Sequence, residues 1–309
     1  MSDQKVKIVM PLRIAALYLI TLIHVVDSSI ANMAVLSISS DLRFHPHQGQ
    51  WIITAFGIGL AAAVPFVTRW TDWLGTRAAL GWALLASASA MLACALASNL
   101  VDIVVARFVQ GMFSGVAVLL CQRQLMAELG TNRRAFALGL WTSAIAIAPV
   151  IGPFFGAVVI QQLSWRWIFL LQLPLLGLSA ACIAQALGLR RTGDKAAPSM
   201  ALFGTVALAM GALLVSIDQL LAGDGHVAAF LMACALVATF ACRALLHREG
   251  QSLFNWALFT HGNYARSMGT VATLNGLAML NGLIYPLWLQ VPQLPLWLRR
   301  AGREPQHAG

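Results

Sequence analysis

Charged residues are scarce in this sequence. They make up 10% of its 309 residues, whereas soluble domains carry roughly 25%. Hydrophobic residues make up 59%, and the mean hydropathy is +0.77. A surface of this composition is poorly solvated by water, which excludes a soluble globular protein. We therefore expect an all-α integral membrane protein, because a succession of open strands would leave backbone groups unpaired in lipid.

Cysteine is also scarce, and its positions form no pattern. The five cysteines are odd in number, and all lie in or at the ends of apolar runs: Cys94, Cys121, Cys182, Cys234 and Cys242. This arrangement argues against a disulfide framework or a metal site and favours small buried side chains. The apolar runs also lack the His/Glu, Ser/His and paired-carboxylate patterns of catalytic sites. We expect neither an enzyme nor a cofactor.

Acidic residues are the scarcer of the two charged classes. There are 11 Asp and Glu against 20 Lys and Arg, which gives a formal net charge of +9. In a soluble protein this excess would suggest nucleic acid as a partner. Here the basic residues lie in short loops between apolar runs, so we expect them to set the orientation in a lipid bilayer and expect no nucleic-acid partner.

The apolar runs predict nine membrane-spanning helices, since a span needs about 20 apolar residues. Their approximate bounds are 14–36, 50–68, 78–98, 101–122, 135–160, 167–188, 199–220, 226–246 and 266–290. The sequence also resembles a secreted chain at its N-terminus, with two lysines before an apolar run. That run is long and is followed by further spans, so we expect a retained first helix rather than a signal peptide.

The distribution of Lys and Arg predicts a cytoplasmic N-terminus. With that orientation fourteen basic residues face the cytoplasm, and only Arg43 and Arg166 lie in outside loops before the ninth span. The fourteen are Lys5, Lys7, Arg13, Arg69, Arg77, Arg123, Arg133, Arg134, Arg190, Arg191, Lys195, Arg243, Arg248 and Arg266. Three further arginines follow the ninth span, on the side where the bias would exclude them. Either the ninth segment does not fully span the bilayer, or residues 291–309 are an atypical tail; we expect a chain end that is truncated or frame-shifted.

Two opposite charges lie inside predicted spans. Asp27 is roughly 21 Å along the first span from Arg13, and Arg107 is roughly 9 Å along the antiparallel fourth span, at 1.5 Å per residue. In a core about 30 Å thick, both reach a similar depth, so they can pair if their helices are neighbours. The pair fits a proton-responsive switch or a static contact that orients two helices. His24, one turn before Asp27, is expected to pack or hydrogen-bond rather than relay protons.

Small residues mark two of the spans. Gly111 and Gly115 in the fourth span, and Gly152 and Gly156 in the fifth, are spaced to let another helix approach closely. Pro149 and Pro153 should loosen the backbone ladder of the fifth span. Close packing alone explains these residues, and a flexible helix at a rocking interface explains them too.

Five motifs at matching positions resemble the major facilitator superfamily, and within it the fourteen-helix drug:proton antiporter group (EmrB/QacA-like). The first-span motif matches Asp27, Asn32 and Ala34, and the fourth-span motif matches Arg107, Gln110 and Gly111. The loop motif matches Asp72, Gly75 and Arg77, with Thr68 replacing its opening glycine.

The antiporter motif of the fifth span matches Gly152, Pro153 and Gly156 after Pro149, and the entry to the sixth span matches residues 165–169.

The resemblance implies a layout of two six-helix halves with two extra helices between them. On this layout the N-terminal half is 1–189, a cytoplasmic linker is 190–198, the extra helices lie in 199–250, an incomplete second half begins in 251–290, and the tail is 291–309. Transporters of this kind rock one half against the other around a midplane site.

The resemblance also implies a function: proton-coupled efflux of amphipathic or cationic small molecules across the cytoplasmic (inner) membrane, powered by the proton gradient. Asp27 would bind the proton and Arg107 would respond to it, while Asp72, Gly75 and Arg77 would act at a cytoplasmic gate. The antiporter motif would shape the interface that keeps transport coupled. A periplasmic adaptor protein is a candidate partner. Weaker candidates for the substrate path are Asn32, Trp51, Phe56 and Met112, for which core packing is the competing explanation.

Two other readings stay open. One is a membrane remnant or interaction protein that transports nothing, since a full second half is not seen. The other is a metabolite carrier of the same superfamily, against which the antiporter motif argues.

Overall fold

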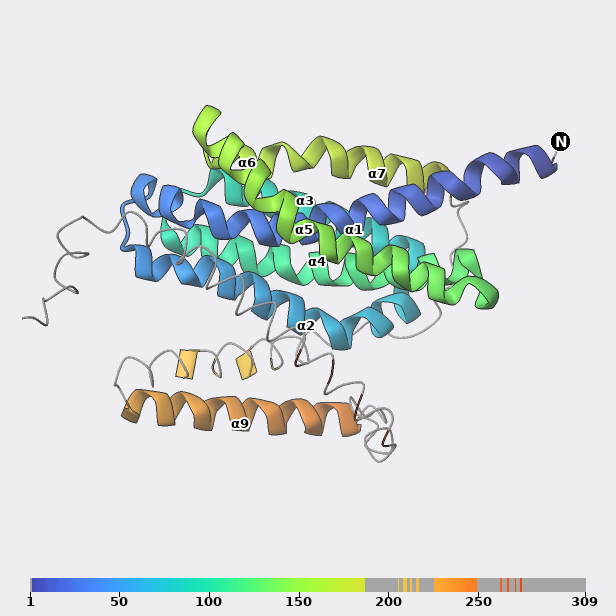
Figure 1. The fold of residues 1–309 in the computed structure, drawn as a ribbon. Helices are drawn as coiled ribbons and strands as arrows, with labels where there is room; N and C mark the ends of the chain where they lie inside the picture. The colour runs from blue at the N-terminus through green and yellow to red at the C-terminus, as the bar shows by residue number, and fades with distance from the viewer. Residues whose placement is uncertain are drawn as a thin grey trace, which may run out of the picture. The chain divides into compact units, whose positions relative to one another are not determined.

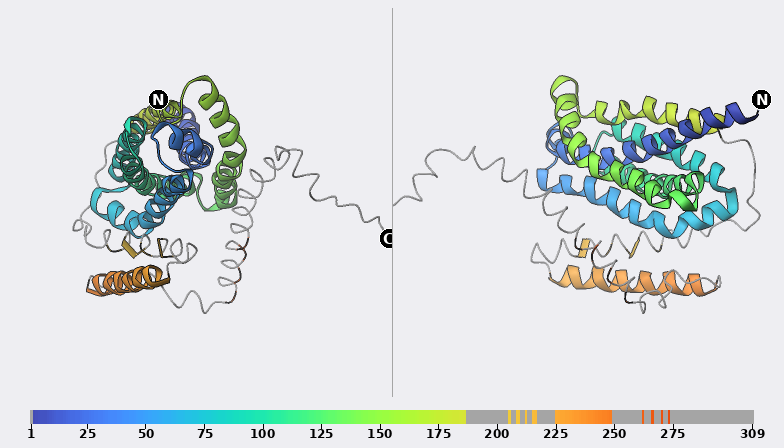
Figure 2. Two further views of the ribbon diagram at one scale, coloured as in Figure 1. Left: turned by 90° about the vertical axis from the view of Figure 1, so that its left-hand side faces the viewer. Right: turned by 45° about the vertical axis from the view of Figure 1, so that its right-hand side comes forward.

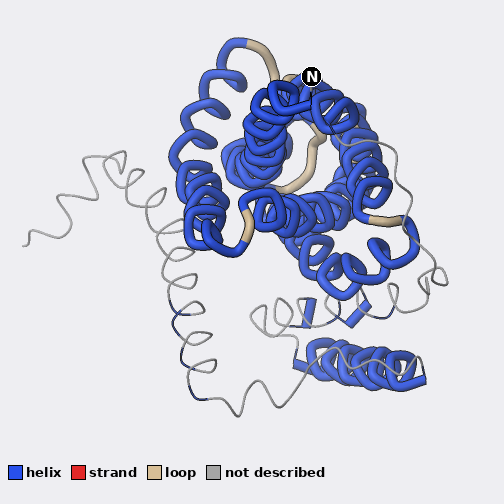
Figure 3. Tube along the Cα trace, turned by 90° about the vertical axis from the view of Figure 1, so that its right-hand side faces the viewer, coloured by secondary structure: helices blue, strands red, loops and turns tan. Residues whose placement is uncertain are grey.

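The structure is a computed structural model that describes residues 2–186, residues 225–248 and scattered positions between 205 and 273. The chain divides into two compact units, Met1–Gln251 and Ser252–Gly309, and nearly all of the second lies outside the described residues. Every regular element in the described part is a helix (Figure 3). The expectation of an all-α membrane protein is confirmed.

The helices α1 to α7 pack side by side as one bundle, seen along its length in Figure 1 and nearly end-on in Figure 2. Their bounds are α1 Ser2–Asp41, α2 Gln50–Leu74, α3 Thr76–Leu96, α4 Leu100–Leu129, α5 Arg134–Gln162, α6 Arg166–Leu170 and α7 Gln172–Ala186. Short 3-10 turns, Pro46–Gly49 and Thr131–Arg133, precede α2 and α5. A further helix, α9, runs over Gly225–Arg248.

Length and apolar composition make five helical segments of the described chain able to cross a membrane: Met10–Asp41, Thr76–Leu96, Leu100–Leu129, Thr131–Gln162 and Arg166–Ile183. The helix α2 makes a sixth if its two parts, which meet at 57° near residue 65, count as one span. The first six predicted spans thus coincide with helices. The eighth coincides with α9, whereas 199–220 and 266–290, like 190–198 and 291–309, lie mostly or wholly outside the described residues.

The bundle presents apolar side chains outward as well as inward. Phe154 is 76% exposed and Val150 74% exposed, both on α5. The interior holds alanine, leucine and isoleucine from α1, α3 and α4, together with Phe169 of α6. An apolar outer surface of this kind matches lipid as its surroundings.

Glycines bring α4 into backbone contact with α2, its most extensively packed partner. A Cβ atom added at Gly111 would lie 2.1 Å from the carbonyl oxygen of Phe56, and one at Gly59 would lie 2.1 Å from that of Phe108. One turn on, a Cβ at Gly115 would lie 2.8 Å from that of Ala63. No larger residue fits at this depth without moving the backbone. The predicted close approach of the fourth span is therefore made toward α2.

Hydrogen bonds tie three helices together at the end of the bundle that was expected to face outside. The carboxylate of Asp41, the last residue of α1, accepts a hydrogen bond from Trp165 Nε1 at 3.0 Å and pairs with the guanidinium of Arg166. Arg166 also donates to the carbonyl oxygen of Ala97, just after α3, and stacks on Trp165 at 4.4 Å. The entry to the sixth span thus anchors the ends of α1 and α3.

We expect Gly59→Ala to destabilise the bundle by roughly 1–3 kcal/mol, because its methyl group would collide with the backbone of α4. Gly57→Ala, on the same helix, is the matched control, since a Cβ there meets nothing within 4 Å. Denaturant unfolding in detergent micelles measures both. Equal stability of the two variants would contradict the packing described.

Candidate functional site

A cluster of four polar side chains is buried in the middle of the bundle. Asp27 of α1 and Gln110 of α4 are 0% exposed, Arg107 of α4 is 1% exposed, and Gln172 of α7 is 5% exposed. Burying an ion in an apolar interior is expensive unless it is paired and hydrogen-bonded. The contacts within the cluster meet that condition.

One oxygen of the Asp27 carboxylate holds the ion pair. Arg107 Nη1 donates to Asp27 Oδ2 at 2.6 Å, and Gln110 Nε2 donates to the same oxygen at 3.0 Å. Arg107 Nη1 also donates to Gln110 Oε1 at 2.9 Å. The three side chains form a closed ring, which fixes the carboxylate relative to the guanidinium. The contact between Asp27 and Arg107 that matching depth predicts is present.

The other carboxylate oxygen faces a different helix. Asp27 Oδ1 accepts a hydrogen bond from Gln172 Nε2 at 3.0 Å, and the same nitrogen donates to the carbonyl oxygen of Ile168 at 2.9 Å. The amide has two hydrogens on Nε2, which is enough to serve both acceptors at once. Its oxygen, Oε1, is buried and has no hydrogen-bond partner.

Aromatic rings enclose the guanidinium of Arg107. It lies 4.3 Å from the ring centroid of Phe56 on α2 and 5.7 Å from that of Phe169 on α6. Arg107 Nε reaches the carbonyl oxygen of Ile52 at 3.5 Å. Both ring faces are attractive to a cation. Together with Cys94 of α3, whose thiol donates to Gln110 Oε1 at 3.4 Å, these contacts draw α2, α3 and α6 into the site.

His24 lies apart from the ion pair, in a site of its own. Its Nδ1 is 2.8 Å from the carbonyl oxygen of Ile20, and its Nε2 is 3.2 Å from Ser87 Oγ on α3. The ring is 2% exposed. Since a carbonyl only accepts, Nδ1 carries a hydrogen. This arrangement agrees with a hydrogen-bonded packing role.

Comparison with known proteins assigns the chain to a family. The family model described as Major Facilitator Superfamily matches residues 17–286. The chain belongs to the major facilitator superfamily.

Three curated proteins illustrate the similarity of this superfamily member to its relatives. The probable multidrug resistance protein EmrY of Escherichia coli is 32% identical over 66% of this chain and 40% of its own length. The multidrug export protein EmrB of the same bacterium is 34% identical over 52% of this chain and 31% of its own length. The fatty acid resistance protein FarB of Neisseria gonorrhoeae is 31% identical over 91% of this chain and 57% of its own length.

Within the superfamily fold, the antiporter motif lies on α5 and faces α1. The helix is continuous from Arg134 to Gln162 through both Pro149 and Pro153. A Cβ added at Gly152 would lie 2.6 Å from Ser29 Cβ and Oγ. One at Gly156 would lie 3.1 Å from a methyl group of Ile30. The two glycines thus let α5 pack closely against Ser29 and Ile30 of α1, which follow Asp27 in the sequence. Other side chains of α5, such as Val150 and Phe154, are exposed.

The loop motif lies where α2 ends and α3 begins. Gly75 joins the two helices with φ of 77°, a backbone conformation that favours glycine. Asp72 and Arg77 flank it and are half-buried. Thr68, which stands where the motif has glycine, accepts a hydrogen bond from Arg123 of α4 at 3.3 Å. The departure from the motif supplies a polar contact between α2 and α4.

The weaker candidates for a substrate path do not gather at one place. Phe56 is buried under the guanidinium of Arg107, so it belongs to the ion-pair site. Asn32 is exposed, and Trp51 and Met112 are half-buried. In the described part of the chain, no hydrogen bond or ion pair joins the last three to the buried cluster.

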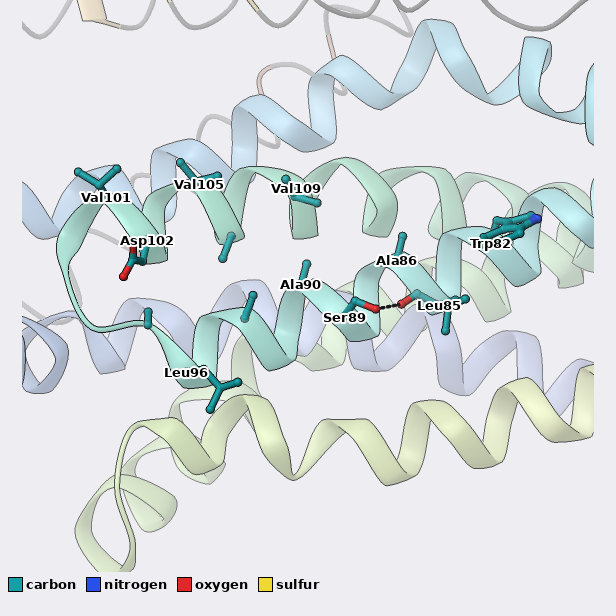
Figure 4. A pocket seen from close by; sticks show the side chains of 13 residues that line it. Trp82, Leu85, Ala86, Ser89, Ala90, Leu96, Val101, Asp102, Val105 and Val109 are labelled. Carbon is teal, nitrogen blue, oxygen red and sulfur yellow. Dashed lines mark hydrogen bonds between the residues drawn. The ribbon is translucent and has the colours of Figure 1, made fainter.

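A groove of about 910 Å³ runs between α3 and α4 (Figure 4). Its lining is apolar except for Ser89 and Asp102. Asp102 is engaged near the start of α4, where its carboxylate accepts hydrogen bonds from Ser98 and Asn99. None of the four clustered side chains lines this groove, so it does not connect to the ion pair.

Gln172 is the site residue that sequence reasoning missed. It follows the entry motif of the sixth span, and a glutamine within an otherwise apolar helix is itself a signal, since its amide needs partners when buried. The matching argument is depth: Gln172 lies six residues past Arg166 in the predicted sixth span, which enters the bilayer from the same side as the fourth. A search for polar residues at the depth of Asp27 would have found it.

We expect Arg107→Leu to destabilise the protein by about 3–5 kcal/mol, because Asp27 would be left buried without its cation. Adding Asp27→Asn to that variant should restore part of the loss. Arg123→Leu, an exposed arginine on the same helix, is the matched control and should change stability by under about 1 kcal/mol. Denaturant unfolding in detergent measures all three, and an equal loss in both single variants would refute the buried pair.

Proposed function

We propose that this protein acts in proton-coupled export of amphipathic or cationic small molecules across the cytoplasmic (inner) membrane, with its N-terminus in the cytoplasm. The observation that carries the proposal is the fully buried Asp27, held by Arg107 inside a membrane-spanning bundle. Intramembrane ionisable residues are rare and mark proton or substrate pathways. The name of EmrB, a multidrug export protein, supports export, and the basic residues listed above support the orientation.

The chemistry follows from the difference between the two partners. A carboxylate takes up a proton, whereas a guanidinium stays charged at any physiological pH. A proton on Asp27 cancels its charge and weakens its bond to Arg107, which then needs other partners. Gln110 and the ring of Phe56 remain in contact with Arg107. Proton binding therefore changes the force between α1 and α4 without exposing either charge.

The remaining motifs take supporting roles in this proposal. Asp72, Gly75 and Arg77 would act at the cytoplasmic gate, where α2 turns into α3. Gly152, Pro153 and Gly156 would keep α5 close to α1, so that a shift of α1 is passed to the exposed face of α5. The substrate would be a small molecule and no chemical reaction would be catalysed. A periplasmic adaptor protein is the proposed partner beyond the bilayer.

The extent of the chain bears on the activity. The three relatives are matched over 31–57% of their lengths, and alternating access rocks one set of helices against another. The competing function is a membrane protein that transports nothing. A metabolite carrier is the other alternative, against which the antiporter motif of α5 argues.

Fatty acids are a second candidate substrate class. FarB, a fatty acid resistance protein, is matched over 91% of this chain. A fatty acid is amphipathic but anionic, so it differs from a cationic dye in the sign of its charge. Parallel export measurements with both probes therefore separate the two classes.

Export is tested in cells that lack their own efflux pumps and express the 309-residue chain. We expect lower retention of a fluorescent cationic dye than in empty cells, and loss of that difference when an uncoupler collapses the proton gradient. Asp27→Asn should abolish export, because the amide binds no proton. Asp102→Asn, an exposed position on α4, should leave export unchanged.

The possible results separate the alternatives. Export that survives both the uncoupler and Asp27→Asn would refute proton coupling through this residue. Normal membrane insertion without export of dye or labelled fatty acid would favour the non-transporting protein.

A further inference from the structure

Gln172 has an unusual position in the buried cluster. Among the described residues, it alone donates a hydrogen bond to Asp27 Oδ1, whereas Oδ2 takes hydrogens from both Arg107 and Gln110. A proton arriving at the carboxylate therefore has the least competition at Oδ1. The residue that it meets there is Gln172.

The amide of Gln172 has a donor, Nε2, that is hydrogen-bonded and an acceptor, Oε1, that is not. Its Nε2 serves Asp27 Oδ1 and the carbonyl of Ile168, while its buried Oε1 has no partner. Leaving a buried acceptor unpaired costs free energy, and such groups call for an explanation. A carboxylate needs a donor, but a carboxylic acid protonated at Oδ1 needs an acceptor. The side-chain amide of Gln172 has both a donor and an acceptor, and a rotation of the amide exchanges the one that faces Asp27.

We propose that Gln172 is a positioning residue that serves both protonation states of Asp27. With Asp27 ionised, Nε2 donates to Oδ1. With Asp27 protonated at Oδ1, the amide turns so that Oε1 accepts the new O–H, while Nε2 stays with Ile168. No electrons move, and the proton remains on the carboxyl group. This inference rests on the proposed proton binding at Asp27 and adds a route from that event to α7.

Gln172 lies at the junction between α6 and α7. Gln172 is the first residue of α7, and Leu171 separates it from the end of α6 at Leu170. Ile168, the second acceptor of the amide, lies in α6. A turn of the Gln172 side chain therefore acts on the junction of the two helices, which is also where Phe169 faces Arg107.

The described residues place few other ionisable groups near Asp27. His24 on α1, Cys94 on α3 and Arg107 on α4 are close enough to interact with it or with each other. The elements α2 and α6 contribute the uncharged rings of Phe56 and Phe169. The helix α5 carries no titratable side chain after its first residue, and α7 carries only a cysteine ten residues beyond Gln172.

Infrared difference spectroscopy of the full chain in lipid nanodiscs tests the inference without requiring transport. Lowering the pH should produce a carboxyl C=O band, which Asp27→Asn identifies by removing it. In Gln172→Met the band should move to higher frequency, since the acid loses its acceptor. Its midpoint should move to higher pH, with about tenfold tighter proton binding, because the lost bond to the carboxylate is the stronger of the two.

Two further variants sharpen the test. Gln172→Glu keeps the side-chain shape and places a second acid beside Asp27, so the first proton should bind more tightly still. Gln162→Met, an exposed glutamine on α5, is the matched control and should give the wild-type spectrum. An Asp27 band that keeps its frequency and midpoint in either folded Gln172 variant would overturn this inference alone. A wild-type chain without any Asp27 band would overturn the proposed proton binding as well.

Discussion

The structure of the bundle depends on one buried ion pair. Arg107 and Asp27 have no exposed surface to speak of, and each would be prohibitive to bury by itself. Their pairing satisfies the charges only together with Gln110, Gln172 and the ring of Phe56. Six helices, α1 to α4 with α6 and α7, must therefore meet at one depth. The ion pair therefore fixes how the helices are positioned along the bundle axis relative to one another.

Close packing makes that meeting possible. Gly111, one residue beyond Gln110, lets the backbones of α4 and α2 touch, which places Phe56 over the guanidinium. Gly152 lets α5 approach the side chain of Ser29 on α1, which lies two residues from Asp27. The glycines of the two motifs thus act through the charged residues that they bring into line. The ion pair therefore depends on the close packing of the helices, and the close packing fixes where the charged side chains lie.

Sequence reasoning reached the ion pair but not its surroundings. Depth along antiparallel spans predicts that Asp27 and Arg107 meet, because the rise per residue of a helix is constant. It named Phe56 only as a weak candidate for a substrate path and did not predict that Arg107 lies over its ring. It also passed over Gln172, whose partners come from α1 and α6. Side-chain partners depend on the rotation of each helix about its axis, and that angle is set by packing.

The sequence by itself determined the class of the protein, its helices and its family motifs, because hydropathy and spacing are local properties that lipid and helix geometry read directly. It also determined that a carboxylate and a guanidinium lie at the same depth. The tertiary structure alone decided which helices are neighbours, so that the glycines of α5 face α1 and those of α4 face α2. It alone divided the two oxygens of Asp27 between α4 and α7. That division is a matter of direction in space, which no one-dimensional pattern contains.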